Sequence, residues 1–440
     1  MVKAVIAQSG GPTSVINSTV KGAFDILFQS DRVDRVLGAK MGILGVLQGQ
    51  LLDISTQDKH QIELLSQTPS AGTLGSCRYK IKSEEDLERI VEVFSKEDIG
   101  FFFYCGGNDS MDTAFKVSKV AREHGLDLVC VGMPKTIDND VGGSLQSDGT
   151  FAICDHNPGY GSVARNLAIN ILEANEENKA SYTSDPVLVI TVMGRKIGFI
   201  PAAARLADPQ RKIPLLLFLP EALSKDDSQS NLEFITERIN EKLKEAGRCI
   251  IVVGEGVNLG DLSVLKDSFG HAQFSASGST AGNLLINYLN GLDRQDKQGR
   301  AKSRLIVQGI ARAENPGTRQ RRELAYVSEV DREEAYQVGA YSAQLALQNQ
   351  DGYMATIIRE AGNSYRVRYD KVPLDVVANA ERKFPKEWIA ENKSDVTDDF
   401  LHWAKPLIGG PLPEFTSFKD IFISQKCGKY IPVGYRISNE

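Results

Sequence analysis

The chain has 440 residues, of which 42% are hydrophobic and 25% are charged, so it is long enough for two domains with large cores. Its 51 basic and 57 acidic residues give a net charge of −6 and no basic stripe, which argues against nucleic acid as the main partner. No apolar run approaches the roughly 18 residues of a membrane helix and no signal peptide opens the chain, so we expect a cytoplasmic protein without membrane contact.

The cysteines and histidines do not indicate a metal site or a disulfide framework. The six cysteines form no C-x-x-C pair and several lie in apolar strand-like runs, so we expect reduced thiols in the core. The five histidines are scattered along the chain. His156 lies beside a glycine-rich turn, but a lone histidine is more often a hydrogen-bonded structural residue than a catalyst, and we assign it no role.

Two strand-to-helix turns near the start of the chain each carry a pair of glycines. The first turn follows the expected strand at 4–7 and contains glycines at 10–11. The second follows the expected strand at 101–104 and contains glycines at 106–107. Paired glycines let the backbone approach an anion closely, and the free amides of a helix N-terminus favour negative charge. Both turns therefore predict phosphate chemistry.

A third turn follows the apolar strand expected at 128–133 and brings Lys135, Asp138 and Asp140 to one place. Ligands of open α/β sheets bind at the carboxyl ends of such buried parallel strands. Side chains alternate in an extended segment, so we expect Asp138 and Asp140 to face one side and Asn139 the other. One carboxylate can then act as a base while the other faces a metal, as phosphoryl transfer requires.

The rest of the chain alternates strands and helices, which is the pattern of a parallel sheet with crossover helices. The expected strands lie at 187–193, 214–219, 249–253 and 303–307, and the expected helices at 196–207, 230–246 and 279–290. The segment 159–164 satisfies the loose G-x-G-x-x-A dinucleotide pattern, but it follows no strand, and we interpret it as the turn that opens a helix. No G-x-x-x-x-G-K-[ST] loop occurs, so a P-loop ATPase is not expected.

These segments resemble the phosphofructokinase family, from the first strand to at least residue 345. The motifs that carry the resemblance occur in the family's order: Gly10-Gly11, Gly72-Thr73-Leu74-Gly75-Ser76-Cys77-Arg78, Gly106-Gly107-Asn108-Asp109-Ser110, Lys135 to Asp140, Pro158-Gly159-Tyr160-Gly161-Ser162, Met193-Gly194-Arg195 and Gly254-Glu255-Gly256. The chain departs from the family at Asn108, where an acidic residue is usual, and at Ala325, where a histidine is usual.

The resemblance implies the phosphofructokinase fold, in which two Rossmann-like three-layer α/β domains with mainly parallel sheets hold the active site in the cleft between them. We place a phosphoryl-donor domain at 1–143 plus 312–361 and a sugar-phosphate domain at 144–311 plus 362–440. The stretch 362–440 is longer than the family core requires. For it we favour exposed polar decoration over an interface or lid element.

Two positions that distinguish phosphoryl donors within the family indicate pyrophosphate. ATP users carry glycine where this chain has Asp109 and Lys135. A carboxylate at 109 would occupy the space of a nucleotide's α-phosphate and repel its charge, whereas an ammonium at 135 would neutralise pyrophosphate. The resemblance also implies Mg²⁺, for which Asp109, Asp140 and the carbonyl oxygen of Asn108 are candidate ligands.

The resemblance thus implies a pyrophosphate-dependent 6-phosphofructokinase, which reversibly moves a phosphoryl group from pyrophosphate to the 1-hydroxyl of fructose 6-phosphate in glycolysis. Asp138 would be the base, with Lys135 and Asp140 as the other catalytic residues. Arginines suit the 6-phosphate because their planar fork binds it bidentately. The residues expected to bind substrate are Gly11, Arg78, Lys80, Thr136, Met193, Gly194, Arg195, Glu255, Arg304 and Arg321.

Three other functions stay open at this point. Transfer from ATP would require an adenine pocket and tolerance of the carboxylate of Asp109. A catalytically silent sugar-phosphate sensor or regulatory subunit would not need the base Asp138, and a dinucleotide oxidoreductase would bind nicotinamide. The family generally self-associates, so we expect a homodimer first and a homotetramer second. Ser184-Asp185-Pro186 replaces an arginine that the family shares between subunits, so subunit contacts are expected to differ here.

Overall fold

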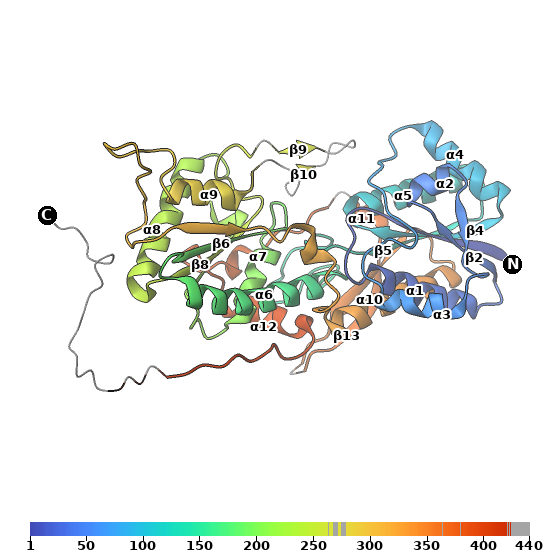
Figure 1. Cartoon of the computed structure of the whole chain (residues 1–440). Coiled ribbons are helices and arrows are strands. Elements are labelled where there is room, and N and C mark those ends of the chain that lie inside the picture. Colours follow the sequence, from blue (N-terminus) through green and yellow to red (C-terminus); the bar gives the residue numbers. More distant parts are fainter. Residues whose placement is uncertain are drawn as a thin grey trace.

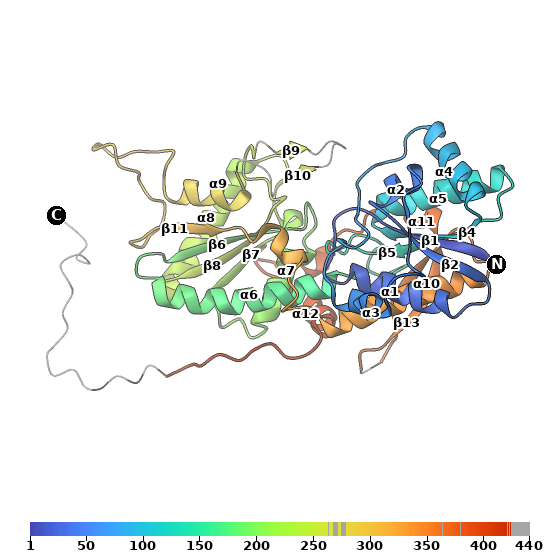
Figure 2. The same ribbon diagram turned by 45° about the vertical axis from the view of Figure 1, so that its right-hand side comes forward.

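The structure is a computed structural model of the chain and describes residues 1–262, 264–266, 272–273, 279–362, 364–378, 380–419, 421 and 423. It consists of two α/β domains that lie side by side, with the N-terminus at the far end of the first domain (Figure 1). Each domain has one main sheet with helices on both faces, as Figure 2 shows from a second direction. The expected three-layer α/β architecture is therefore confirmed.

The first domain is built on a seven-stranded sheet of order β13-β12-β5-β4-β1-β2-β3. Its strands are β1 (Val2–Gln8), β2 (Val33–Ala39), β3 (Leu51–Asp53), β4 (Ile99–Gly106), β5 (Val129–Pro134), β12 (Tyr353–Arg359) and β13 (Val367–Pro373). The five inner strands are parallel, and β3 and β13 pair antiparallel at the two edges. The central strand β4 is buried along its whole length, which explains its continuous apolar sequence.

Helices cover both faces of this sheet. One face carries α1 (Ile16–Phe28), α3 (Lys59–Glu63) and α10 (Glu329–Leu347), and the other carries α2 (Ile43–Leu47), α4 (Glu84–Lys96), α5 (Asn108–Glu123) and α11 (Leu374–Val377). Helices α1 and α10 approach closely because Gly22 and Gly339 lie at their crossing. A Cβ atom at either glycine would overlap a backbone carbonyl oxygen of the other helix.

The second domain is built on a four-stranded parallel sheet of order β11-β6-β8-β7. Its strands are β6 (Val187–Val192), β7 (Leu215–Phe218), β8 (Cys249–Gly254) and β11 (Ala311–Glu314). One face packs against α6 (Tyr160–Ser181), α7 (Phe199–Ala203) and α12 (Asp398–Ala404), and the other against α8 (Ser228–Ala246) and α9 (Ala281–Leu289). Strands β9 (Leu265–Lys266) and β10 (Ala272–Gln273) form a separate antiparallel pair.

The expected strand at 303–307 is wrong, and β11 occupies the sheet edge instead. Asn240 of α8 explains the difference, because its side chain accepts from the backbone nitrogen of Ile306 (3.1 Å) and donates to the carbonyl of Arg304 (3.0 Å). These side-chain bonds satisfy backbone groups that would otherwise need a neighbouring strand. The expected strands at 187–193, 214–219 and 249–253 are confirmed as β6, β7 and β8.

Sheet membership also differs from the expected domain limits at two places. Strand β11 pairs with β6 in the second domain, although residues 312–314 were assigned to the first. Strand β13 and helix α11 extend the first domain to residue 377, because β13 pairs with β12 along its whole length. The chain therefore passes between the domains three times, at 142–159, at 315–328 and near residue 380.

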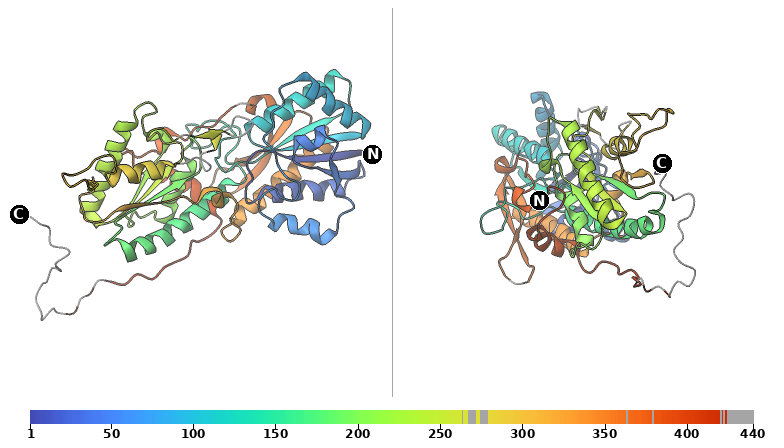
Figure 3. Two further views of the ribbon diagram at one scale, coloured as in Figure 1. Left: turned by 45° about the horizontal axis from the view of Figure 1, so that its top comes forward. Right: turned by 90° about the vertical axis from the view of Figure 1, so that its left-hand side faces the viewer.

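Residues 367–408 contribute a strand and buried side chains to the cores of both domains, so the interpretation as exposed decoration is wrong for this stretch. The second domain buries an aromatic cluster that consists of Phe384, Trp388, Phe400 and Trp403, together with Phe199 and Phe151. From residue 410 to residue 419 the chain has no regular structure and runs alongside the second domain, as the view from above in Figure 3 shows.

Two expectations from the sequence concern the cysteines, which should be reduced core thiols, and the absence of a membrane helix. Cys77, Cys105, Cys130, Cys154 and Cys249 are buried and free, whereas the sixth cysteine, Cys427, lies outside the described residues. None of the helices in the described part of the chain is long and apolar enough to cross a membrane.

We expect Phe400→Ala to destabilise the second domain by about 3–5 kcal/mol, because a fully buried ring is lost from the aromatic cluster. Phe418 is 90% exposed, so Phe418→Ala should change the free energy of unfolding by less than about 0.5 kcal/mol. Urea denaturation can be followed by tryptophan fluorescence, because both tryptophans of the chain lie in this cluster. Equal unfolding midpoints for the two variants would contradict the assignment of this region to the core.

Candidate active site

A cavity of about 400 Å³ lies between the two domains, at the carboxyl ends of β1, β4 and β5 on one side and of β6 and β8 on the other. It brings together most of the residues that the sequence singled out. These are Gly11, Arg78, Lys80, Asn108, Asp109, Lys135, Thr136, Asp138, Asp140, Met193, Arg195, Glu255 and Arg321. Gly194 lies between the lining residues Met193 and Arg195, in the turn after β6, with a φ of 122° that a glycine adopts without strain.

Lys135 lies at the floor of the cavity and is only 4% exposed. Its Nζ atom donates to the carbonyl oxygen of Gly11 (2.7 Å). Gly10, with a φ of 74°, leaves room for the ammonium, because a Cβ there would lie 3.1 Å from Nζ. Burial lowers the pKa of Lys135 to about 8, against the opposing influence of the Cys105 thiol and the Asp140 carboxylate. Lys135 is therefore still mainly protonated at neutral pH, but it loses its proton only slightly above it.

Asp138 is the second ionisable group of the floor, and its side chain is 13% exposed. Burial, followed by the negative charge of Asp140, raises the pKa of Asp138 to about 7. The guanidinium of Arg195 opposes this shift, with its Nε atom 3.8 Å from Oδ2 of Asp138. A carboxylate with this pKa can accept and return a proton near neutral pH, as a general base must.

The expectation that Asp138 and Asp140 face one side and Asn139 the other is confirmed, but its premise of an extended segment is wrong. Asn139 has a φ of 56°, in the left-handed region, so residues 138–140 form a turn and not an extended segment. The side chain of Asn139 is buried beneath the turn, where Oδ1 accepts from the backbone nitrogen of Asn157 (2.9 Å). Asp138 and Asp140 both line the cavity nevertheless, because the turn projects them to the same side.

Two buried oxygens of the cavity fit a divalent cation. Oδ1 of Asn108 and Oδ1 of Asp140 have no hydrogen-bond partner in the described structure, although Nδ2 of Asn108 donates to the carbonyl of Asp140 (3.3 Å). The described residues contain no group of three or more His, Cys, Asp or Glu side chains that could hold a metal. A magnesium ion often takes only one or two protein oxygens and fills its other positions with water and phosphate oxygens.

Asp109 is less suited to the metal than expected, since its carboxylate is half exposed. Oδ1 of Asp109 pairs with Nζ of Lys80 (2.8 Å), and both side chains lie on the cavity wall. The pair places one positive and one negative charge beside the glycine turn that opens α5, with the carboxylate on the helix and the ammonium on the loop that precedes α4.

Two arginines meet above Gly11. Arg321 ends a short 3₁₀ helix, Gly317–Arg321, and a Cβ atom at position 11 would overlap its guanidinium and lie 3.7 Å from Nη2 of Arg78. A side chain at position 11 would therefore displace the guanidinium of Arg321. Burial, followed by the positive charge of Arg78, lowers the pKa of Arg321. Two converging guanidinium groups favour an anion between them.

The second domain contributes a tight turn after β6. Glu255 is buried and its Oε1 accepts from the backbone nitrogen of Arg195 (3.0 Å), while Gln320 accepts from the backbone nitrogen of Met193 (3.2 Å). Sequence reasoning missed Gln320, although it adjoins Arg321. It also assigned no site role to eight other residues that line the cavity. Six lie in or near the motifs named above, namely Ser9, Pro12, Tyr79, Ser110, Thr113 and Ile137, and two lie far along the chain, namely Ala380 and Glu381.

Arg304, which was expected to bind substrate, lies outside this cavity. Its guanidinium donates to Asp293 (2.6 Å to Oδ2) and lies 3.6 Å from the ring centroid of Tyr288. These contacts hold it within the second domain, on the side of the sheet covered by α9. Arg304 is therefore not part of the binding cavity of its own chain.

Two backbone amides of the glycine turn at 159–164 already have an internal partner. Backbone nitrogens of Gly159 and Ser162 donate to the carboxylate of Asp331 (2.8 and 2.9 Å), which is buried. An internal carboxylate thus occupies the place that a pyrophosphate takes in a dinucleotide-binding turn. The interpretation of this segment as a helix-opening turn is confirmed, since α6 begins at Tyr160.

Residues 3–288 match the family model described as phosphofructokinase. The chain belongs to the phosphofructokinase family. It is 36% identical over 423 residues to the pyrophosphate–fructose 6-phosphate 1-phosphotransferase of Halomonas elongata, which covers 92% of both chains. It is 33% identical over 443 residues to the protein of the same name from Methylococcus capsulatus, covering 96% of this chain and 97% of that one. The expected resemblance to the pyrophosphate-dependent branch is confirmed.

A solved structure extends this similarity to the fold. The crystal structure of pyrophosphate-dependent phosphofructokinase from Marinobacter aquaeolei superposes with a TM-score of 0.77 at 31% identity, covering 97% of this chain and 98% of that one. The phosphofructokinase fold that the sequence implied is thus confirmed over nearly the whole chain.

We expect Arg321→Met to weaken binding of the anionic substrates by roughly 10- to 100-fold, because hydrogen bonds to charged groups contribute about 1.5–3 kcal/mol. Calorimetric titration with fructose 6-phosphate and, separately, with pyrophosphate would measure this loss. Arg319→Met is the matched control, since Arg319 lies on the same short helix but pairs with Glu323 at the surface. Wild-type affinity of Arg321→Met for both ligands would remove Arg321 from the site.

Proposed function

We propose that this chain catalyses the reversible transfer of a phosphoryl group from pyrophosphate to the 1-hydroxyl of fructose 6-phosphate, giving fructose 1,6-bisphosphate and phosphate. The observation that carries the proposal is that the buried Lys135 and the 13% exposed side chain of Asp138 lie together at the floor of an interdomain cavity. The names of the similar proteins support the same donor and acceptor.

Asp138 takes the proton of the 1-hydroxyl as the oxygen attacks a phosphorus of pyrophosphate. The new phosphorus–oxygen bond forms on the sugar, the bridging bond of pyrophosphate breaks, and phosphate leaves with the bonding electrons. Lys135 neutralises the phosphate that leaves, and Arg78 lies on the same side. In the reverse direction Asp138 returns the proton. A pKa of Asp138 near 7 suits both directions, because neither protonation state is strongly favoured at neutral pH.

The two domains divide the substrates between them in this proposal. The turns after β1, β4 and β5 supply Gly11, Asp109 and Lys135 for pyrophosphate. The turns after β6 and β8 supply Arg195 and Glu255 for the sugar, with Met193, Gly194 and Thr136 beside it and Arg321 for the 6-phosphate.

Mg²⁺ is the proposed metal, and Asn108 and Asp140 are the residues that would hold it, with Asp109 nearby. When bound it supplies charge neutralisation of the phosphate oxygens. The partnerless oxygens of Asn108 and Asp140 support this choice, because buried polar atoms normally have a partner.

The two donor-selecting residues weigh against the ATP alternative. Asp109 is paired with Lys80 on the cavity wall, so the wall facing a nucleotide's α-phosphate carries a carboxylate. The buried ammonium of Lys135 matches the compact charge of pyrophosphate. A catalytically silent regulatory role gains no support, since the base, the ammonium and the metal-facing oxygens are all present in one cavity.

Self-association and location are further parts of the proposal. A homodimer is proposed first and a homotetramer second, as the family resemblance implies. A cytoplasmic site of action is proposed because glycolytic sugar phosphates are the substrates.

The test of the donor is to measure formation of fructose 1,6-bisphosphate from fructose 6-phosphate and Mg²⁺ with pyrophosphate and with ATP in parallel. We expect turnover with pyrophosphate and none with ATP, and a decrease on the order of 10²-fold or more in Asp138→Ala with little change in sugar-phosphate binding. The double variant Asp109→Gly, Lys135→Gly should lose pyrophosphate use. Turnover with ATP alone would keep the base and overturn the donor assignment.

The two displaced pKa values predict a narrow pH optimum. The value of kcat/KM should rise with pH as Asp138 loses its proton near pH 7, and fall as Lys135 loses its proton near pH 8. In Lys135→Arg the alkaline limb should move to higher pH, because a guanidinium stays protonated there. An unchanged alkaline limb in that variant would assign it to another group.

A further inference from the structure

The turn that carries Asp138 and Asp140 belongs to no helix or strand, since β5 ends at Pro134 and α6 begins at Tyr160. Asn139, between the two carboxylates, has a left-handed backbone with a φ of 56°, which is unfavourable for a residue with a side chain. The regular hydrogen bonds of a sheet or helix therefore do not fix the direction of either carboxylate. Other contacts must hold this conformation.

Asn157 provides these contacts from beneath the turn, where it is fully buried. Its backbone nitrogen donates to Oδ1 of Asn139 (2.9 Å). Its side chain accepts from the backbone nitrogen of Val141 (3.0 Å) and donates to the carbonyl of the same residue (2.8 Å). The residues on both sides of Asp140 are thus bound to Asn157, while Oδ1 of Asp140 has no hydrogen-bond partner in the described structure. The backbone is fixed and the carboxylate stays available.

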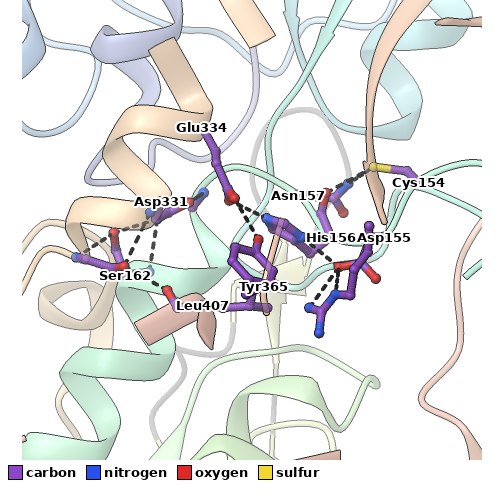
Figure 4. A network of polar contacts seen from close by, with 12 residues as sticks. Cys154, Asp155, His156, Asn157, Ser162, Asp331, Glu334, Tyr365 and Leu407 are labelled. Atoms are coloured by element: carbon purple, nitrogen blue, oxygen red, sulfur yellow. Dashed lines mark hydrogen bonds and ion pairs between the residues drawn. The ribbon is translucent and has the colours of Figure 1, made fainter. Parts of the chain in front are cut away.

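His156 anchors Asn157 through its neighbouring position in the chain. The imidazole is 1% exposed and lies between two carboxylates, with Nδ1 2.9 Å from Asp155 and Nε2 2.7 Å from Glu334 (Figure 4). Burial acts to lower the pKa of His156, but Glu334 and Asp155 raise it to about 9. At neutral pH both ring nitrogens therefore donate, and His156 bridges its own segment to helix α10.

The two carboxylates beside His156 have further partners. Asp155 accepts from Arg359 at the end of β12 (3.0 Å) and from the indole nitrogen of Trp403 in α12 (3.2 Å). Glu334 accepts from the hydroxyl of Tyr365 (2.6 Å), which Figure 4 shows beside it. Two negative and two positive side chains are thus paired in the interior and join the segment at 154–157 to the first domain, while Trp403 joins it to the second.

We propose that Asn157 is a positioning residue for the carboxylates of Asp138 and Asp140, and that His156 fixes Asn157 in place. Neither side chain lines the cavity, so both act through the turn and touch no substrate. The proposal rests on the phosphoryl transfer proposed above, in which Asp138 must face the attacking hydroxyl. A displacement of about 1 Å in a reacting group can lower a rate on the order of 10²-fold.

The test combines a structural and a kinetic measurement on full-length Asn157→Ala. Amide hydrogen exchange at residues 137–142 should be faster than in the wild type on the order of 10-fold or more, because Val141 loses two hydrogen bonds. The kcat should fall on the order of 10- to 100-fold while KM for fructose 6-phosphate changes by less than about twofold. The Mg²⁺ concentration for half-maximal rate should rise.

Ser162→Ala is the matched control. Ser162 is as buried as Asn157 and follows it closely in the chain, but it bonds Asp331 and not the turn. Its loss should lower the unfolding temperature while leaving exchange at 137–142, kcat and the Mg²⁺ dependence within about twofold of the wild type. Asn139→Gly is the second variant, since glycine adopts a positive φ without strain and the change removes only the bond to the backbone of Asn157. It should also speed exchange at 137–142.

Two results would overturn the proposal. One is an amide exchange rate at residues 137–142 of Asn157→Ala that equals the wild-type rate. If Asn157→Ala does not fold, the same comparison is made with Asn139→Gly. The other is an equal acceleration in Ser162→Ala, which would indicate general loosening. The exchange measurement does not depend on enzyme activity. If the wild-type protein were inactive, the proposed reaction would be refuted, but the exchange rates would still show whether Asn157 positions the turn.

Discussion

Burial takes Lys135 and Asp138 out of water, and each would tend to lose its charge if the other and its neighbours were absent. The pKa of the lysine is lowered and that of the aspartate is raised, so the two values approach each other near neutral pH. The negative charge of Asp140 raises the pKa of both groups, so it favours the charged lysine and the neutral form of Asp138. The floor of the cavity is therefore a set of mutually dependent charges, and the rest of the structure has to hold them at fixed separations.

The protein meets this requirement by surrounding the turn with bonds from distant parts of the chain. Arg382, which is buried, donates from its backbone to the carbonyl of Asp140 (2.8 Å) and from its guanidinium to the carbonyls of Asp155 and Val141 (2.8 and 3.2 Å). Asn157 binds the same turn from the other side. A short loop with an unfavourable backbone conformation is stable here because the surrounding fold over-determines it.

Short sequence patterns predicted the buried strands and the turns that follow them, because apolar runs and glycine pairs act within a few residues. The apolar runs of β4, β6 and β8 are buried on both faces, and glycine pairs mark the turns after β1 and β4. The strand expected at 303–307 failed because Asn240, more than sixty positions earlier, satisfies its backbone groups. No local pattern reveals such a partner.

The site shows the same division between local and distant information. Lys135 and Asp138 were found because their motif is contiguous in the sequence. Glu381 reaches the cavity only through the return of the chain between domains, and Arg304 lies away from it because Asp293 and Tyr288 hold its guanidinium elsewhere. Side-chain alternation predicted the directions of Asp138, Asn139 and Asp140 correctly, although a positive φ at Asn139 makes this segment a turn.

The three passages of the chain between the domains have a consequence for its mechanical integrity. The first passage carries Asn157, the second carries Arg321 and the third carries Arg382. Because these connectors run in parallel, hydrolysis of the backbone in one of them leaves the domains tethered by the other two. A break would thus not separate the halves of the molecule. Each break would free only the side chain that its connector carries, which is Asn157, Arg321 or Arg382. Cleavage at each place would therefore disturb a different part of the site in a protein whose domains stay together.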